Sequence, residues 1–102
     1  MGKLLLLAAA LSLALVRAAA AADVKVETGK RTYGDYCATC HGEDLQNNSS
    51  VSFDLRRLRE GDRTRFVNAV KNGKNAMPSW KGVLGDDKID ALWAYVRANA
   101  NR

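Results

Sequence analysis

Apolar residues recur at helical spacing in the C-terminal half of the chain and never alternate with polar residues over the length of a strand. The pattern is clearest in residues 86–99, where Ile89, Leu92, Trp93 and Val96 stand at positions i, i+3, i+4 and i+7. Aspartates open this segment and an arginine lies near its end, which matches the helix dipole. The segment is therefore predicted to form an amphipathic helix.

Earlier stretches carry weaker helical signals. They are residues 30–41, which Gly42 can end; a single turn at 55–58; and residues 63–72, which Asp62 can cap and Gly73 can end. Residues 23–28 are expected to form an irregular lead-in, and the polar residues 43–54 a loop. Because no strand is predicted, the expected fold class is all-α.

The first residues follow a different pattern, in which Lys3 precedes a largely apolar run from Leu4 to Val16. Small residues follow this run and end in Ala20-x-Ala22. A basic start, a short apolar run and an A-x-A-like end are typical of a secretory signal peptide. The run is shorter than the roughly 20 apolar residues that a membrane span needs, so no stable membrane insertion is expected.

We therefore expect residues 1–22 to be a cleaved signal peptide and residues 23–102 to form one exported domain in the periplasm. Cleavage after Ala20 is the alternative position. Arg17 is unusual in a cleavage region, which keeps an uncleaved anchor open.

The charges of the chain do not favour a nucleic-acid partner. Removal of Lys3 and Arg17 with the signal peptide would leave 14 basic and 11 acidic residues, a net charge of +3. These charges are scattered, whereas nucleic-acid binding requires a dense basic stripe. The densest basic run, residues 54–65, is interpreted as a solvated face, with a docking site as the alternative.

Both cysteines and the only histidine lie in one short segment, CATCH, at residues 37–41. On a helix, Cys37, Cys40 and His41 stand at i, i+3 and i+4 and face the same way. A zinc site would need a further pair of ligands, and no Cys or His follows His41. A thiol–disulfide motif is expected beside a βαβ pattern, which the chain lacks.

The spacing C-x-x-C-H is also the signature of covalent haem attachment. Two thiols on one helical face can each bond to a vinyl group of the same haem, and the adjacent histidine can then reach its iron. The domain would have 102 − 22 = 80 residues, and domains of this size often need a disulfide, a metal or a cofactor to complete a stable core. A haem would supply the missing apolar surface. We predict one haem c, attached through Cys37 and Cys40 and ligated by His41, with zinc and thiol–disulfide sites as alternatives.

Met77 is the candidate for the sixth ligand of the iron. It is the only methionine left once Met1 leaves with the signal peptide, and it lies in the irregular segment AMPSW rather than on a helix face. Pro78 restricts Met77 to an extended backbone. A sixth ligand would keep substrates from the metal and so favour electron transfer. The alternative is that Met77 fills a gap in the core.

The sequence resembles the small class I cytochromes c of the bacterial periplasm over residues 29–98. The resemblance rests on the stretches GKRTYGDYCATCHG, NGKNAMPSW and LGDDKIDALWAYVR. It implies a cytochrome c fold of three to five short helices around one haem, in which the first and last helices cross. The residues that it brings together at this crossing are Gly29 and Tyr33 with Leu92, Trp93 and Tyr95.

The same resemblance implies that Trp80 lies against the haem with its indole near a propionate, with simple core packing as the alternative. Many members of the family hold the ligating histidine through a carbonyl in a turn that contains proline. Residues 42–54 contain no proline, so the acceptor for His41 is left open. Arg56 and Arg57 are candidates to neutralise propionates, or are ordinary solvated arginines.

These observations predict a monomeric electron carrier rather than an enzyme. The C-terminal segment is similar to cytochromes that accompany PQQ-dependent alcohol dehydrogenases, so the expected donor is a periplasmic quinoprotein dehydrogenase, and the expected acceptor a terminal oxidase or another cytochrome. Lys74 and Lys81 flank Met77 and either form a salt-sensitive docking rim or serve solubility. The alternative functions are a haem sensor or enzyme in which Met77 dissociates, and a colourless thiol or metal module.

Overall fold

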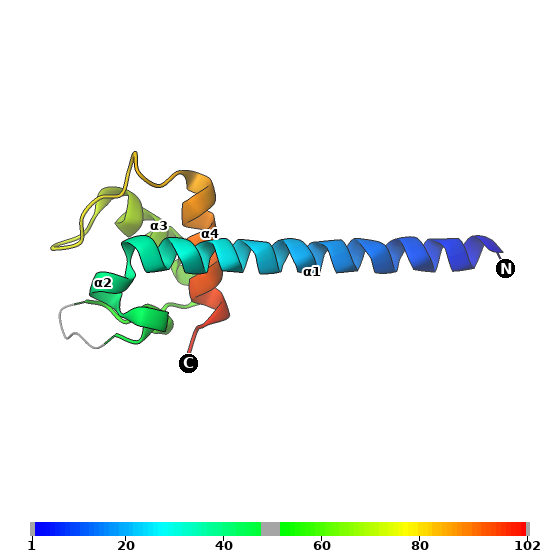
Figure 1. Ribbon diagram of the computed structural model, residues 1–102, viewed down its shortest axis with the longest axis horizontal. Coiled ribbons are helices and arrows are strands. Elements are labelled where there is room, and N and C mark those ends of the chain that lie inside the picture. Colours follow the sequence, from blue (N-terminus) through cyan, green and yellow to red (C-terminus); the bar gives the residue numbers. More distant parts are fainter. Residues whose placement is uncertain (1, 48–51, 102) are drawn as a thin grey trace.

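The computed structural model describes residues 2–47 and 52–101, so part of the predicted loop, residues 48–51, lies outside the described residues. Within them the elements are α1 (Gly2–Tyr36), α2 (Ala38–His41), the 3₁₀ turns η1 (Glu43–Leu45), η2 (Leu55–Arg57) and η3 (Glu60–Asp62), α3 (Arg63–Asn72) and α4 (Asp86–Ala98) (Figure 1). The described residues form no strand and only one isolated bridge. The all-α prediction is confirmed.

The two C-terminal helices begin and end close to the predicted positions. Gly73 follows α3 with φ of 76°, and Gly42 follows α2 with φ of 89°, so both glycines end helices as expected. Asp62 stands at the N-cap position of α3, but its carboxylate accepts instead from the backbone N–H of Arg59, at 2.8 Å. The cap therefore stabilises the preceding turn, η3.

The predicted irregular lead-in at residues 23–28 is wrong, because α1 runs through this stretch without a break. Two contacts with the rest of the domain explain the helix. Val26 is partly buried against the core, and Lys25 Nζ lies 2.9 Å from Asp90 Oδ2 on α4. The predicted helix at residues 30–41 is also divided, since Cys37 separates α1 from α2.

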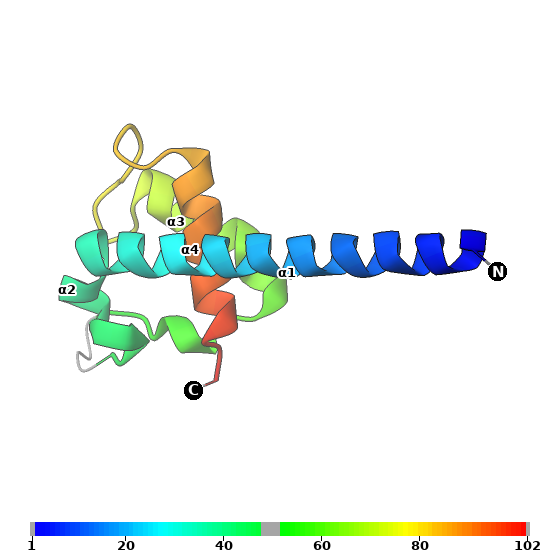
Figure 2. The same ribbon diagram turned by 45° about the vertical axis from the view of Figure 1, so that its right-hand side comes forward.

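Helix α1 crosses α4, as Figures 1 and 2 both show. Gly29 is buried at the crossing, where a Cβ atom would lie 1.9 Å from the carbonyl oxygen of Ala91 and 2.8 Å from Cβ of Tyr95. One turn later, the ring of Tyr33 packs against that of Tyr95 with a centroid distance of 5.3 Å. The contact of Gly29 and Tyr33 with Tyr95 that the resemblance implied is confirmed.

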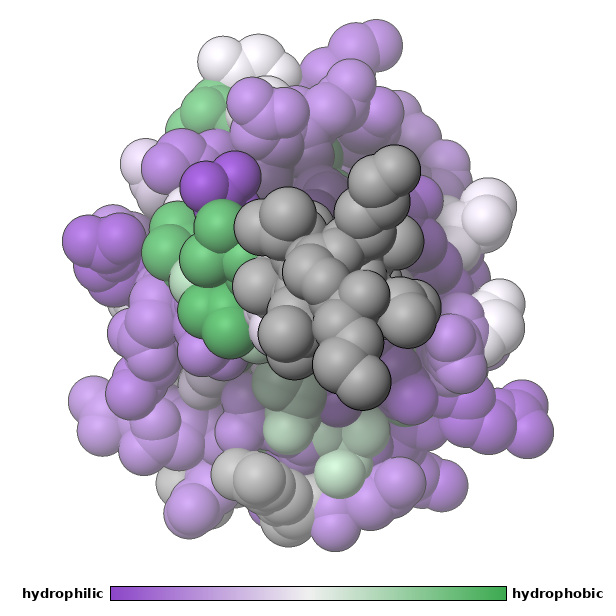
Figure 3. Space-filling model, turned by 90° about the vertical axis from the view of Figure 1, so that its right-hand side faces the viewer, coloured by the Kyte–Doolittle hydropathy of each residue, from purple (hydrophilic) through white to green (hydrophobic). Residues whose placement is uncertain are grey.

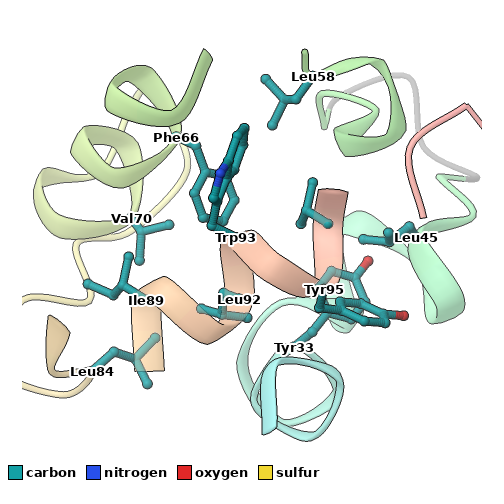
Figure 4. Packing of buried hydrophobic residues seen from close by; sticks show 11 residues of the cluster. Tyr33, Leu45, Leu58, Phe66, Val70, Leu84, Ile89, Leu92, Trp93 and Tyr95 are labelled. Carbon is teal, nitrogen blue, oxygen red and sulfur yellow. The ribbon is translucent and has the colours of Figure 1, made fainter. Parts of the chain in front are cut away.

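Trp93 packs in a different direction from the one implied. Its ring lies 5.2 Å from that of Phe66 on α3, on the other side of α4 from Tyr33 and Tyr95 (Figure 4). Leu45 is 1% exposed, although it belongs to the stretch predicted as a polar loop. The core cluster consists of Tyr33, Leu45, Leu58, Phe66, Val70, Leu84, Ile89, Leu92, Trp93, Tyr95 and Val96.

The N-terminal part of α1 extends away from the other helices (Figure 1). Residues 12–25 are all exposed, and the apolar Leu15 and Val16 are 67% and 65% exposed. Viewed from the side on which α1 projects, most of the coloured surface is hydrophilic, with a few hydrophobic patches (Figure 3). No helix in the described part of the chain has the length and hydropathy that crossing a membrane requires.

Candidate functional site

A mainly apolar cavity of about 500 Å³ opens between α1, α2, α3, α4 and the segment that carries Met77. All five predicted site residues line it: Cys37, Cys40, His41, Met77 and Trp80. Leu92 and Val96 of α4 line it as well, so the crossing of α1 and α4 also forms part of the cavity wall. Residues far apart in the sequence thus share one enclosure.

The CATCH segment forms a tight turn at the end of α1. The backbone N–H of Cys37 donates to the carbonyl of Tyr33 at 2.8 Å, and that of His41 donates to the carbonyl of Cys37 at 2.9 Å. The hydroxyl of Tyr33 donates to the carbonyl of Gly42 and so holds the far end of the segment. Burial, and then the neighbouring Cys37, raises the pKa of Tyr33 far above its usual value, so this hydroxyl remains a donor.

Both cysteines are free, with Cys37 half-buried and Cys40 exposed. Burial, and next the nearby Cys40, raises the pKa of Cys37 to about 11. The Cys37 thiol is therefore protonated at neutral pH. Among the described residues, no group of three or more His, Cys, Asp or Glu side chains is arranged to hold a metal ion.

His41 finds its hydrogen-bond partner in the backbone of the loop that follows. Its Nδ1 lies 3.0 Å from the carbonyl oxygen of Phe53. A carbonyl can only accept, so Nδ1 carries a proton, and in the neutral imidazole Nε2 has the lone pair. This bond identifies the acceptor that the sequence left open, and it leaves Nε2 able to bind a metal.

Two residues that sequence reasoning did not assign to the site also line the cavity. Phe53 comes from the predicted loop, and Arg65 comes from α3, where its guanidinium carbon lies 5.1 Å from the centroid of the Phe53 ring. The sequence offered one sign of Phe53, since it is the single aromatic residue of a polar stretch. Arg65 was not singled out, because it belongs to the basic run at residues 54–65 that was interpreted as a solvated face.

Met77 lies in a short hairpin rather than on a helix, as expected. Its backbone exchanges hydrogen bonds with that of Lys74, at 2.9 and 3.1 Å. A Cβ atom at Gly73 would lie 2.7 Å from the carbonyl oxygen of Met77, and φ at this glycine is 76°, so other residues would strain the turn. The hairpin directs a partly buried Met77 to the cavity wall.

Trp80 is fixed by its backbone and by an aromatic neighbour. The backbone N–H of Trp80 donates to the carbonyl of Val70 on α3 at 2.9 Å. Its ring meets the ring of Tyr36 edge-on, with a centroid distance of 5.3 Å. Both rings line the cavity. Trp80 therefore closes the gap between the end of α1 and the Met77 segment.

The cationic residues near the site differ in their surroundings. Arg56 forms an ion pair with Asp54 at 2.9 Å, and this hydrogen-bonded partner holds the pKa of Asp54 below its usual value. Arg57 and Lys81 are exposed and do not line the cavity, whereas the exposed Lys74 does.

Comparison with known proteins identifies relatives over most of the chain. Residues 24–96 match the family described as cytochrome C oxidase, cbb3-type, subunit III. Cytochrome c6 of Tetradesmus obliquus is 39% identical over 83 residues, which cover 72% of this chain and 89% of the relative. Cytochrome c6 of Thermosynechococcus vestitus is 33% identical over 94 residues, covering 88% of this chain and 82% of the relative.

The oxidase subunit CcoP of Azospirillum brasilense is 36% identical over 79 residues, which cover 69% of this chain. The matched part is only 27% of CcoP, so this chain corresponds to one segment of a much longer protein. No solved structure matches the chain.

Proposed function

The chain belongs to the class I c-type cytochromes, and on that premise we propose that its CATCH segment and Met77 together hold one haem c. Members of this family are electron-transfer proteins and not enzymes, and their haem c is covalently bound. Cys37 and Cys40 form the two thioether bonds in this proposal. His41 and Met77 ligate the iron, and Trp80 packs against the haem.

The cavity supports this assignment on three counts. Its volume of about 500 Å³ and its apolar lining suit a large flat cofactor, since cofactor pockets usually enclose about 300–1,000 Å³. Neither cysteine is in a disulfide. His41 already uses Nδ1 for the bond to Phe53, which leaves Nε2 for the metal.

The residues around the cavity determine how such a cofactor behaves. Haem c supplies the redox chemistry, a single electron taken up and given back by its iron. The bond from His41 Nδ1–H to the Phe53 carbonyl orients the imidazole and makes it a stronger donor. The soft thioether of Met77 favours the ferrous state and raises the potential. Leu92 and Val96 give the cavity wall an apolar surface.

One observation carries the proposal: the fold brings Met77, from a segment far along the chain, to the wall that Cys37, Cys40 and His41 share. The test is the optical spectrum of the protein produced together with a haem-attachment system. We expect covalently bound haem and a low-spin ferric spectrum with a sulfur-ligand band. A colourless product with a Cys37–Cys40 disulfide would contradict the proposal, and a high-spin spectrum would favour the sensor alternative, in which Met77 leaves the iron.

We also propose that residues 1–22 are a cleaved signal peptide and that the mature domain works as a monomer in the periplasm. The charge pattern of the first residues and the exposure of residues 12–22 support the cleaved signal peptide. Export of the chain, with sequencing of the mature N-terminus, tests it. A mature protein that still begins at Met1 would contradict it.

For partners, we propose a periplasmic dehydrogenase, such as a quinoprotein, as donor and a terminal oxidase or another cytochrome as acceptor. The similarity to CcoP, named as a subunit of a cbb3-type oxidase, supports an oxidase on the acceptor side. Rapid mixing of the reduced protein with purified oxidase, and of the oxidised protein with candidate dehydrogenases, tests each step. Electron transfer at the rate of a control without the partner would exclude that partner.

A further inference from the structure

We propose that Arg65 is a positioning residue for His41 and that it acts through the ring of Phe53. The inference rests on the proposed ligation of iron by His41. It concerns a chain of two contacts, from the Arg65 guanidinium to the Phe53 ring and from the Phe53 carbonyl to His41 Nδ1.

The first contact joins two walls of the cavity. Arg65 belongs to α3, whereas Phe53 belongs to the loop between η1 and η2. The guanidinium carbon lies 5.1 Å from the centroid of the ring, a distance at which a cation is attracted to an aromatic face. Phe53 is 42% exposed, so this attraction acts on a residue that the core does not enclose.

Two of the described hydrogen bonds near Phe53 join residues that lie close together in the sequence. The carbonyl of Ser52 accepts from the Asn47 side chain at 2.5 Å, and the carboxylate of Asp54 accepts from the N–H of Arg56 at 3.0 Å. No proline stiffens this loop. The Arg65 contact adds a link between Phe53 and α3.

This link matters because the ring and the carbonyl belong to the same residue. Rotation of the Phe53 backbone would swing its carbonyl away from His41 and would also lift its ring from Arg65. An anchored ring opposes that rotation and keeps the carbonyl in line with Nδ1–H. Arg65 thus helps to fix the orientation of the imidazole without touching it.

The test measures exchange of the His41 Nδ1 proton in the reduced holoprotein by NMR. In Arg65→Met we expect this proton to exchange about two- to fivefold faster, the factor that corresponds to an exposed cation–π contact. Its resonance should move upfield as the hydrogen bond lengthens. Amide protons of α4 report global opening, and their exchange should stay unchanged.

Two further variants make the result specific. Arg57→Met removes the same charge from an exposed arginine that does not line the cavity, and it should leave the exchange of the His41 proton unchanged. Phe53→Leu keeps the backbone carbonyl but removes the ring. In that background Arg65→Met should have no further effect, because the two residues act as one unit.

Equal exchange rates in Arg65→Met and Arg57→Met would overturn the inference. So would an effect of Arg65→Met that is as large in the Phe53→Leu background as in the wild type. The wild-type spectrum tests the proposed function separately, so a failure of ligation is told apart from a failure of Arg65 to act on His41.

Discussion

His41 is fixed by two neighbours that no spacing rule in the sequence would name. The carbonyl of Phe53 accepts from its ring, and the hydroxyl of Tyr33 holds the carbonyl of the next residue, Gly42. Both partners lie outside the C-x-x-C-H motif. In the proposed haem site the motif supplies the reactive groups, and these neighbours supply the orientation of His41.

At the scale of single residues we predict that Met77→Ala keeps the covalent haem but changes the redox potential and the spin state of its iron. Loss of the thioether should lower the midpoint potential by on the order of 0.1 V, since axial ligands set haem potentials over a range of about 0.8 V. The ferric spectrum should also change from low spin to high spin. Redox titration and optical spectroscopy measure both effects.

Val83→Ala is a suitable control for this variant, because Val83 is 59% exposed in the same segment. Its potential should equal that of the wild type. An unchanged potential in Met77→Ala would show that another residue holds the sixth position.

The sequence singled out Cys37, Cys40, His41 and Met77, all of which line the cavity. It could do so because C-x-x-C-H and the M-P pair are short patterns in which neighbours along the chain are neighbours in space. Phe53 and Arg65 could not be predicted in this way. Their contact depends on where a loop without regular structure packs against α3, and this position cannot be predicted from periodicity or motif spacing. Leu45 was missed for the same reason.

At the scale of helices, the close approach of α1 and α4 depends on Gly29. We predict that Gly29→Ala destabilises the protein by about 1–3 kcal/mol, the usual cost of overpacking, because the added methyl would meet the Ala91 carbonyl at 1.9 Å. Denaturant unfolding measures this loss.

Gly34→Ala is the matched control on the same helix. A Cβ atom at Gly34 would have no neighbour within 4 Å, so this change should stabilise the protein by roughly 0.5–1 kcal/mol, the helix-forming advantage of alanine over glycine. Equal effects at both glycines would contradict the packing at the crossing.

Asp90 joins three helices through two exposed ion pairs, with Lys25 of α1 at 2.9 Å and Arg63 of α3 at 3.1 Å. Lys25 first, and then Arg63, holds the pKa of Asp90 below its usual value. A carboxyl whose pKa is lower in the folded state stabilises that state above the unfolded pKa of about 4, and the stabilisation disappears as the pH falls through the folded pKa.

We therefore predict that Asp90→Asn costs about 0.5–1 kcal/mol near pH 7, as is usual for exposed ion pairs, and almost nothing near pH 2. Urea unfolding of the wild type and the variant at both pH values measures the difference. High salt should reduce it at pH 7. A difference that does not depend on pH would exclude the ion pairs as its source.

The helices themselves were predictable to different degrees. The bounds of α3 and α4 followed from apolar periodicity, and the end of α3 also from Gly73, because each helix buries one face of its own. No helix was predicted for the stretch DVKVET, residues 23–28. Its helical form depends on contacts of Val26 and Lys25 with distant residues. Local sequence cannot record such contacts.

At the scale of the whole molecule, the projecting part of α1 contributes little to the domain. We predict that a chain beginning at Asp23 has the same free energy of unfolding as the full chain within about 0.5 kcal/mol, because residues 12–22 are exposed. Calorimetry or denaturant unfolding of both forms measures it. A loss of several kcal/mol would mean that this part of α1 is structural.

The crossing of α1 and α4 also sets an order of events during biogenesis. Lys25 and Asp90 are 65 residues apart, so the ends of the domain meet only when nearly all of it has been made. Until then α1 has no partner, and the wall formed by Leu92 and Val96 is missing. The CATCH thiols therefore lack one wall of their cavity in any state of the chain in which α4 has not docked, and a haem-attachment enzyme would have access to them in that state.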